Sequence, residues 1–213
     1  MRFFWVAFFK NTRFLSTQVP AEAPDPIADS SLYTKNMLEP KWVQDGITVY
    51  NKEHNIMQNG NNLAGNSSST QSAVIIKQPG NNSIYYLFTV DFRSGTLDFR
   101  YSEIDINLDN GLGGIVPSTK NTLVLNPSCE KIAAIQHQNG TDYWIIAHEF
   151  GSNNFYSYLL SSSGLAPGIV SASGSVVSLS VNAVGYLRAS ADGSRLVSAR
   201  KEQNVELFSF NNI

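Results

Sequence analysis

The sequence predicts an all-β protein: a partial, open β-propeller of about three four-stranded blades behind an irregular N-terminal segment. Three observations support this prediction. From Asp45 onward, short β-rich runs alternate with polar turns, the same order of runs returns three times, and the middle runs are apolar on both faces. A strand that is apolar on both faces has to lie between two other layers, as a blade does when it packs face to face with its neighbours.

The repeated unit begins near residues 73, 131 and 186. Each copy contains a strand, a turn, a second strand, another turn and a third strand. The predicted strands are 73–77, 84–90 and 97–105, then 131–136, 142–148 and 154–160, then 186–189, 195–199 and 205–210. Segments 121–125 and 169–173 are candidate fourth, outer strands, and their spacing favours propeller blades over helical repeats.

Turns and side chains recur together with the strands. The predicted turns are Pro79-Gly80-Asn81-Asn82, Arg93-Ser94-Gly95, Asn139-Gly140, Gly151-Ser152-Asn153 and Asp192-Gly193. Tyr85-Tyr86 corresponds to Tyr143-Trp144, and Asp91-Phe92 corresponds to Glu149-Phe150 at the same offset. These correspondences indicate an internal repeat.

Residues 1–44 and 45–213 read as two different kinds of sequence. The first segment has four prolines and no sustained period of 2 or 3.6, which predicts irregular structure. In the second, the Asp45-Gly46 turn leads into a strand over 47–50, and the polar tract 58–72 predicts a long exposed loop.

Composition and charge exclude several classes of partner. Charged residues make up only 15% of the chain, against roughly 25% in typical soluble domains, and the net charge is −2. Nucleic acids and anionic membranes require clustered Lys and Arg, so we expect neither as a partner. No apolar run is long enough for membrane insertion, and the polar surface of Asn, Ser, Thr and Gln suits an extracellular protein.

The N-terminus has some of the features of a signal peptide but not all of them. Arg2 and the apolar run 3–9 resemble a signal-peptide core, and Ala21-Glu22-Ala23 resembles a cleavage site. Lys10 and Arg13 make that apolar core shorter than a signal peptide requires, so these residues alone do not decide whether the chain is exported.

The metal candidates are Asp105, Asn107 and Asp109, because alternating oxygen side chains can converge on a calcium ion. Glycine falls one position late for a calcium loop, and Val116 stands where a bidentate Glu belongs. We therefore expect a strand that ends in an Asn-Gly turn, with no metal and no cofactor.

No catalytic motif is visible. The single cysteine, Cys129, lies in a predicted Pro-Ser-Cys-Glu turn without a base beside it in sequence. The histidines are His54, His137 and His148, and a two-residue turn at Asn139-Gly140 places His148 opposite Lys131. Glu103 and Asp105 share a strand face, where we expect their carboxylates to be solvated and not to act as an acid–base pair. We expect no enzyme.

Several blocks resemble a known family. They are DGITVYN (45–51), GNSSSTQS (65–72), YYLFTVD (85–91), YSEID (101–105), GTDYW (140–144) and GYLRAS (185–190). Together they resemble the N-terminal, WD-like propeller region of Bacteroidetes surface proteins that carry gliding-motility-associated or type IX secretion sorting domains. The resemblance covers about residues 45–213 and implies export and a surface role. Ser190-Ala191-Asp192-Gly193 also resembles a WD-like hairpin, with Ala191 replacing the usual proline.

Three functional hypotheses follow. The first is a non-catalytic binding or scaffold module of a bacterial cell-surface or secreted protein, related to gliding motility or adhesion, which contacts a glycan or protein through loops at the blade ends. The alternatives are a truncated gene product without independent activity and a propeller enzyme, either a lyase or a hydrolase. An open propeller also predicts unpaired apolar faces on its first and last blades, including Tyr186, Leu196 and Phe208, and hence self-association.

Overall fold

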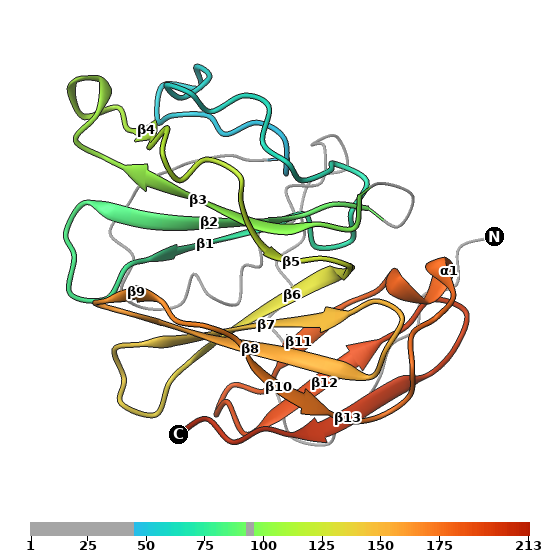
Figure 1. Ribbon diagram of the computed structural model, residues 1–213. Helices are drawn as coiled ribbons and strands as arrows, with labels where there is room; N and C mark the ends of the chain where they lie inside the picture. The colour runs from blue at the N-terminus through green and yellow to red at the C-terminus, as the bar shows by residue number, and fades with distance from the viewer. Residues whose placement is uncertain (1–44, 93–95) are drawn as a thin grey trace, which may run out of the picture.

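A computed structural model describes residues 45–92 and 96–213, which form three antiparallel sheets that follow one another along the chain (Figure 1). The predicted N-terminal segment 1–44 and the predicted turn Arg93-Ser94-Gly95 lie outside the described residues. Helical structure in the described part is limited to one turn, α1 (Ser180–Ala183), and a 3-10 turn at Asp109–Gly111. The prediction of an all-β protein is therefore confirmed.

The first sheet is built from the first repeat. Its strands are β1 (Ala73–Lys77), β2 (Ile84–Val90), β3 (Phe99–Asp105), β4 (Gly114–Ile115) and β5 (Thr122–Leu125). β2 lies between β1 and β3, and both β4 and β5 pair with β3. The predicted turn between β1 and β2 forms because Asn81 Oδ1 accepts the N–H groups of Ser83 and Ile84.

The second sheet is built from the second repeat. Its strands are β6 (Ser128–Gln136), β7 (Tyr143–Glu149), β8 (Asn154–Ser161), β9 (Gly164–Leu165) and β10 (Ile169–Ala172). β6 and β7 pair from Gln136↔Tyr143 to Ile132↔Ala147, in the register that the Asn139-Gly140 turn predicted. The register then shifts before Ser128↔Glu149, so β6 contains an irregularity that the sequence did not predict.

The third sheet contains β11 (Leu187–Ala189), β12 (Arg195–Ala199) and β13 (Val205–Ser209). The β11–β12 turn is held by Asp192, whose Oδ1 accepts the Ser194 N–H and whose Oδ2 accepts the Ser194 hydroxyl. These bonds lower the pKa of Asp192 to about 2, with the Ser190 hydroxyl as the largest cause. In the described part of the chain, this sheet ends at β13 without a fourth strand.

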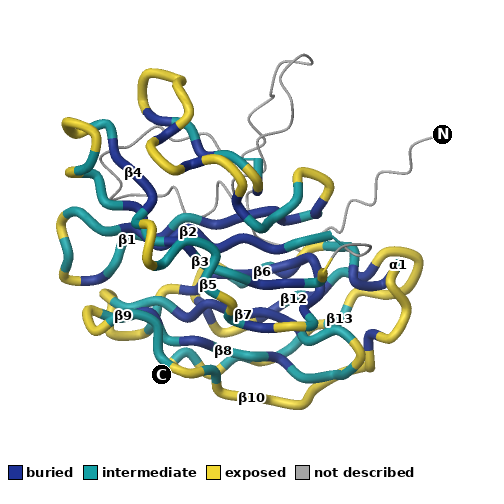
Figure 2. Tube along the Cα trace, turned by 45° about the horizontal axis from the view of Figure 1, so that its top comes forward, coloured by how far each residue is buried: buried dark blue, intermediate teal, exposed yellow. Residues whose placement is uncertain are grey.

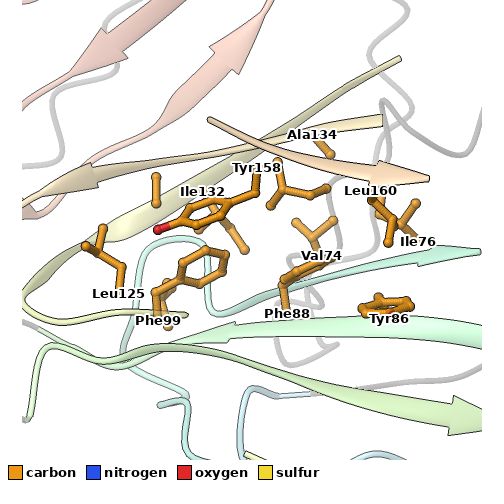
Figure 3. Close-up of a cluster of buried hydrophobic side chains, with 13 residues drawn as sticks. Val74, Ile76, Tyr86, Phe88, Phe99, Leu125, Ile132, Ala134, Tyr158 and Leu160 are labelled. Atoms are coloured by element: carbon orange, nitrogen blue, oxygen red, sulfur yellow. The ribbon is translucent and has the colours of Figure 1, made fainter. Parts of the chain in front are cut away.

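The second sheet lies between the other two. One of its faces packs against the first sheet around Phe88 and Phe99 from the first sheet and Ile132 and Tyr158 from the second (Figure 3). The other face packs Trp144 and its neighbours against the third sheet. β7 is thus buried on both faces, as predicted from its apolar side chains on both sides, whereas the loops and β10 are exposed (Figure 2).

The repeated aromatic pair has the same role in both copies. Tyr86 of β2 faces the second sheet, and its counterpart Trp144 of β7 faces the third sheet. The preceding residues face the other way: Tyr85 packs in the cluster on the outer face of the first sheet, and Tyr143 packs against the first sheet. The corresponding side chains therefore have the same orientation: in each of the two sheets, the second residue of the pair faces the sheet that follows in the chain.

The predicted outer face of the third sheet was wrong for two of its three residues. Leu196 and Phe208 are directly cross-strand neighbours and point toward the second sheet, where the Phe208 ring lies 5.1 Å from that of Phe155. Exposed apolar side chains on the opposite face are Val205, Leu207 and Tyr186. The predicted set thus combined residues of both faces, because Tyr186 lies on the side of Val205 and Leu207 while Leu196 and Phe208 lie on the inner side.

The segment before β1 also differs from its prediction. Instead of a strand over 47–50, the structure has an isolated bridge between Tyr50 and Ile56. Val49, Met57 and Leu63 are buried and cover the outer face of the first sheet, so that face is not open. The tract 58–72 is a loop, but its last residues are buried, since the hydrogen bonds described below draw them inward.

The packing between the first two sheets predicts a large effect for one truncation. Phe88→Ala removes a ring that is fully buried between Phe99 and Tyr101, so we expect the free energy of unfolding to fall by about 3–5 kcal/mol. Leu123→Ala on β5 is the matched control, because Leu123 is 51% exposed, and it should change stability by less than about 0.5 kcal/mol. Urea denaturation measures both, and equal losses would contradict the sheet-on-sheet core.

Candidate functional site

The three sheets meet at a short polar segment, Ser69–Gln71, just before β1. The Gln71 side chain is buried and bonds to both main-chain groups of Leu187 on β11. Its Oε1 accepts the Leu187 N–H at 2.7 Å, and its Nε2 donates to the Leu187 carbonyl at 3.2 Å. A side-chain amide thereby pairs with the inner edge of the third sheet as a neighbouring strand would.

The residues beside Gln71 bond to the other sheets. The Thr70 N–H donates to Glu130 Oε2 on β6 at 3.0 Å, and Thr70 Oγ1 accepts the Gly185 N–H at 3.2 Å. The Ser69 hydroxyl donates to the Val90 carbonyl on β2 at 3.0 Å. We call these contacts of Ser69, Thr70 and Gln71 the inter-sheet tie, since they join all three sheets.

Gly185 is required at the tie because the chain approaches another backbone closely there. A Cβ at this position would lie 2.1 Å from the Ala199 carbonyl oxygen, far inside any real contact. Only glycine lets the chain pass beside β12 and still present its N–H to Thr70.

A cysteine and a histidine meet where β6 departs from regular pairing. Cys129 Sγ lies 3.4 Å from His148 Nδ1, and both residues are buried. The prediction that Cys129 occupies a turn was wrong: it lies within β6, beside a base contributed by β7. His148 would stand opposite Lys131 in a regular ladder, but the register shift between Ser128 and Ile132 brings Cys129 to it instead.

Burial keeps both members of the pair neutral. It raises the pKa of the Cys129 thiol to about 12 and lowers the pKa of His148 to about 4, with Lys131 and Arg200 lowering the latter further. At neutral pH the contact joins a thiol and a neutral imidazole. A thiolate–imidazolium pair, which nucleophilic catalysis requires, is disfavoured here.

Two buried cations lie near this pair. Lys131 Nζ donates to the carbonyls of Ala199 at 3.0 Å and Asn182 at 3.5 Å, and burial lowers its pKa. Arg200 Nη2 donates to Asn204 Oδ1 at 2.7 Å and lies 3.1 Å from Glu206 Oε1. Within the described residues, Arg200 Nε and Nη1 have no hydrogen-bond partner. These groups connect the second sheet to the β12–β13 turn.

A surface hollow lies beside Arg200. Its volume is about 330 Å³, and it is lined by Ser175, Val176, Arg200, Gln203 and Asn204. Glu206 Oε1 accepts both the N–H and the hydroxyl of Ser175, one of the lining residues, at 3.2 and 2.8 Å. Four of its five lining side chains can form hydrogen bonds, and contacts with charged groups hold two of them, Asn204 and Ser175.

The calcium candidates take part in a local turn. Asp105 Oδ1 accepts the Asn107 N–H at 2.9 Å, and Asp109 begins the 3-10 turn, where Asn110 has a left-handed backbone. No group of three His, Cys, Asp or Glu side chains suited to a metal ion is found among the described residues. The other two histidines lie elsewhere, His54 in an exposed loop and His137 beside the β6–β7 turn.

The repeated carboxylates have a structural role. Asp91 accepts the N–H groups of Phe92 and Thr96 in the turn after β2. Glu149, at the equivalent position after β7, accepts the Ser152 hydroxyl and the Asn154 amide, and these bonds lower its pKa. Both acids thus stabilise the turn that joins the second strand of a repeat to the third.

No protein-family profile, curated protein or solved structure matches the chain. Within the described part, no helix has the length and apolar character needed to cross a membrane.

The inter-sheet tie generates a stability prediction. Gln71→Ala leaves the buried N–H and C=O of Leu187 without their partner, so the free energy of unfolding should fall by about 1–3 kcal/mol. Gln136→Ala is the control, because Gln136 is exposed at the end of β6 and makes only a local bond to Gly140. Chemical denaturation of the two variants should separate them, and an equal stability would show that the tie contributes nothing.

The buried imidazole predicts a dependence of stability on pH. The pKa of His148 is about 4 in the folded chain and 6.5 when unperturbed, so its contribution is complete above pH 6.5. As the pH falls from 6.5 toward 4, the unfolded chain binds a proton that the folded chain does not, and up to about 3 kcal/mol of stability is lost. His148→Gln should reduce this slope, with the part due to carboxylates such as Glu149 remaining, whereas His137→Gln should retain it in full. A slope unchanged in His148→Gln would contradict the assignment.

Proposed function

We propose that the chain is a non-catalytic scaffold and binding module of a bacterial cell-surface or secreted protein, built from propeller-type blades. The observation that carries the proposal is the order of the sheets. Each repeat forms one antiparallel sheet, and the sheets stack in chain order with the inner strands β1, β6 and β11 packed beside one another. That arrangement, together with the resemblance to surface propellers, supports a module that presents loops from a rigid stack.

The use of the buried polar groups supports a scaffold over an enzyme. Gln71, Thr70 and Glu130 bond sheets to one another, and Lys131 bonds to main-chain carbonyls. Cys129 and His148 are both neutral and enclosed. The cavity beside Arg200 is lined by neither a carboxylate nor a histidine. A lyase or hydrolase would require acid–base groups that face a substrate, so this alternative has the weaker support.

The cavity beside Arg200 is the proposed contact surface, and a glycan is the proposed ligand. Gln203, Asn204 and Ser175 offer amide and hydroxyl groups around a shallow hollow, as the recognition of sugar hydroxyls requires. Arg200 and Glu206 hold Asn204 and Ser175 in place. Groups positioned in advance lose less entropy when a ligand binds.

A binding array of bacterial and host polysaccharides tests the proposal. We expect the full chain to retain a polysaccharide above the signal of an unrelated propeller, and Gln203→Ala to weaken that binding by roughly tenfold through the loss of about 1–2 kcal/mol of hydrogen bonding. Gln136→Ala, which alters an exposed glutamine outside the cavity, should bind as the native chain does. Equal binding by both variants would place the contact elsewhere, and retention of surface proteins alone would replace the glycan with a protein ligand.

A further inference from the structure

The third sheet differs from the other two at its outer edge. In the first sheet β5 pairs with the third strand of the repeat, β3, and in the second sheet β10 pairs with the third strand, β8. The equivalent strand of the third sheet is β13, and in the described part of the chain nothing pairs with its outer side. In the first two sheets the third strand of the repeat pairs with a further antiparallel strand, whereas in the third sheet this position beside β13 has no strand among the described residues.

The hydrogen-bond pattern shows which groups this edge presents. The Arg200 N–H donates to the Asn204 carbonyl, and the Phe210 N–H donates to the Ser194 carbonyl. Bonding in an antiparallel pair alternates, so the main-chain groups of Val205, Leu207 and Ser209 point away from β12. Among the described residues, no strand lies on that side to pair with them.

The outer side of this edge carries neither a proline nor a charged side chain that would oppose pairing. Val205 and Leu207 are 66% and 55% exposed, and β13 contains neither a proline nor a lysine. Its one charged residue, Glu206, turns toward Arg200 and Ser175 on the inner face. An unguarded edge with exposed β-branched and aliphatic side chains favours the addition of another strand.

We infer that this edge is an interface between two copies of the chain, in which β13 pairs antiparallel with β13 of a second copy about Leu207. The strand is self-complementary in that register. Leu207 meets Leu207 of the other copy, Val205 meets Ser209, and Glu206 meets Phe208, so no like charges stand opposite one another. The pairing continues the β11–β12–β13 ladder into one sheet shared by both copies. It satisfies the free main-chain groups and buries part of the Leu207 side chain.

Cysteine cross-linking tests the register on the full chain. Residues opposite each other in a hydrogen-bonded pair have Cα atoms about 5.5 Å apart, within the range of a disulfide. Leu207→Cys should therefore form a covalent dimer under mild oxidation, while the native Cys129 is buried and should not react. Ser209→Cys is the matched control on the same strand and face. Its two copies would lie about 14 Å apart and should remain unlinked. Equal cross-linking of both variants, or of neither, would overturn the proposed pairing.

Light scattering provides the second measurement. The native chain should show twice the monomer mass at concentrations where Leu207→Pro shows the monomer mass. This substitution removes an N–H that points outward and leaves the bonds to β12 intact. Circular dichroism should show that the variant keeps its sheets. A native monomer would overturn the inference. If the amide hydrogens of Val205 and Leu207 were also protected from exchange in that monomer, another segment of the same chain would be the occupant of the edge.

Discussion

The arrangement of the molecule depends on how one buried amide is satisfied. Gln71 is placed where the three sheets meet, and burial makes every unpaired polar group there costly. Its bonds to both main-chain groups of Leu187 satisfy the buried amide and the buried backbone. They also join the first sheet to the third, although the two residues are far apart in sequence. The bonds of Thr70 to Glu130 and Gly185 repeat the same solution one residue earlier. Apolar packing alone would bring the sheets together without specifying how far each one slides over the next.

The same principle explains the character of the buried Cys129 and His148 pair. Reactive cysteines lie in partly exposed, electropositive surroundings that stabilise the thiolate. Here Lys131 and Arg200 supply positive charge, but burial outweighs them and raises the pKa of the thiol. The pair therefore resembles the rest of the polar interior, in which ionisable side chains make structural contacts between strands. Because the buried polar groups have structural roles, they favour a scaffold. Interactions with other molecules are then expected at the surface, at the cavity beside Arg200 and at the edge of β13.

Much of the fold was predictable because it depends on local pattern. The runs 84–90 and 142–148, which are apolar on both faces, the turn residues Asn81, Asn139 and Asp192, and the side-chain correspondence between repeats indicated three strand groups and two outer strands. The face of the third sheet was assigned wrongly since Leu196 and Leu207 are both apolar, and only the neighbouring sheet distinguishes them. The polar tract before β1 was predicted to be exposed because composition cannot show which of its amides is met by a partner more than a hundred residues away.

By itself, the sequence determined the β class, the period of the repeat, the turns at Asn81, Asn139 and Asp192, and the absence of a strong charge imbalance, all of which follow from neighbouring residues or from totals. Only the tertiary structure decided that Cys129 meets His148, because a shift in register between β6 and β7 overrides the regular pairing that spacing predicts. It also decided that Ser69, Thr70 and Gln71 join three sheets, and that β13 ends its sheet within the described residues. These features depend on contacts between distant segments, and such contacts are selected by the geometry of packing rather than by local residue preference.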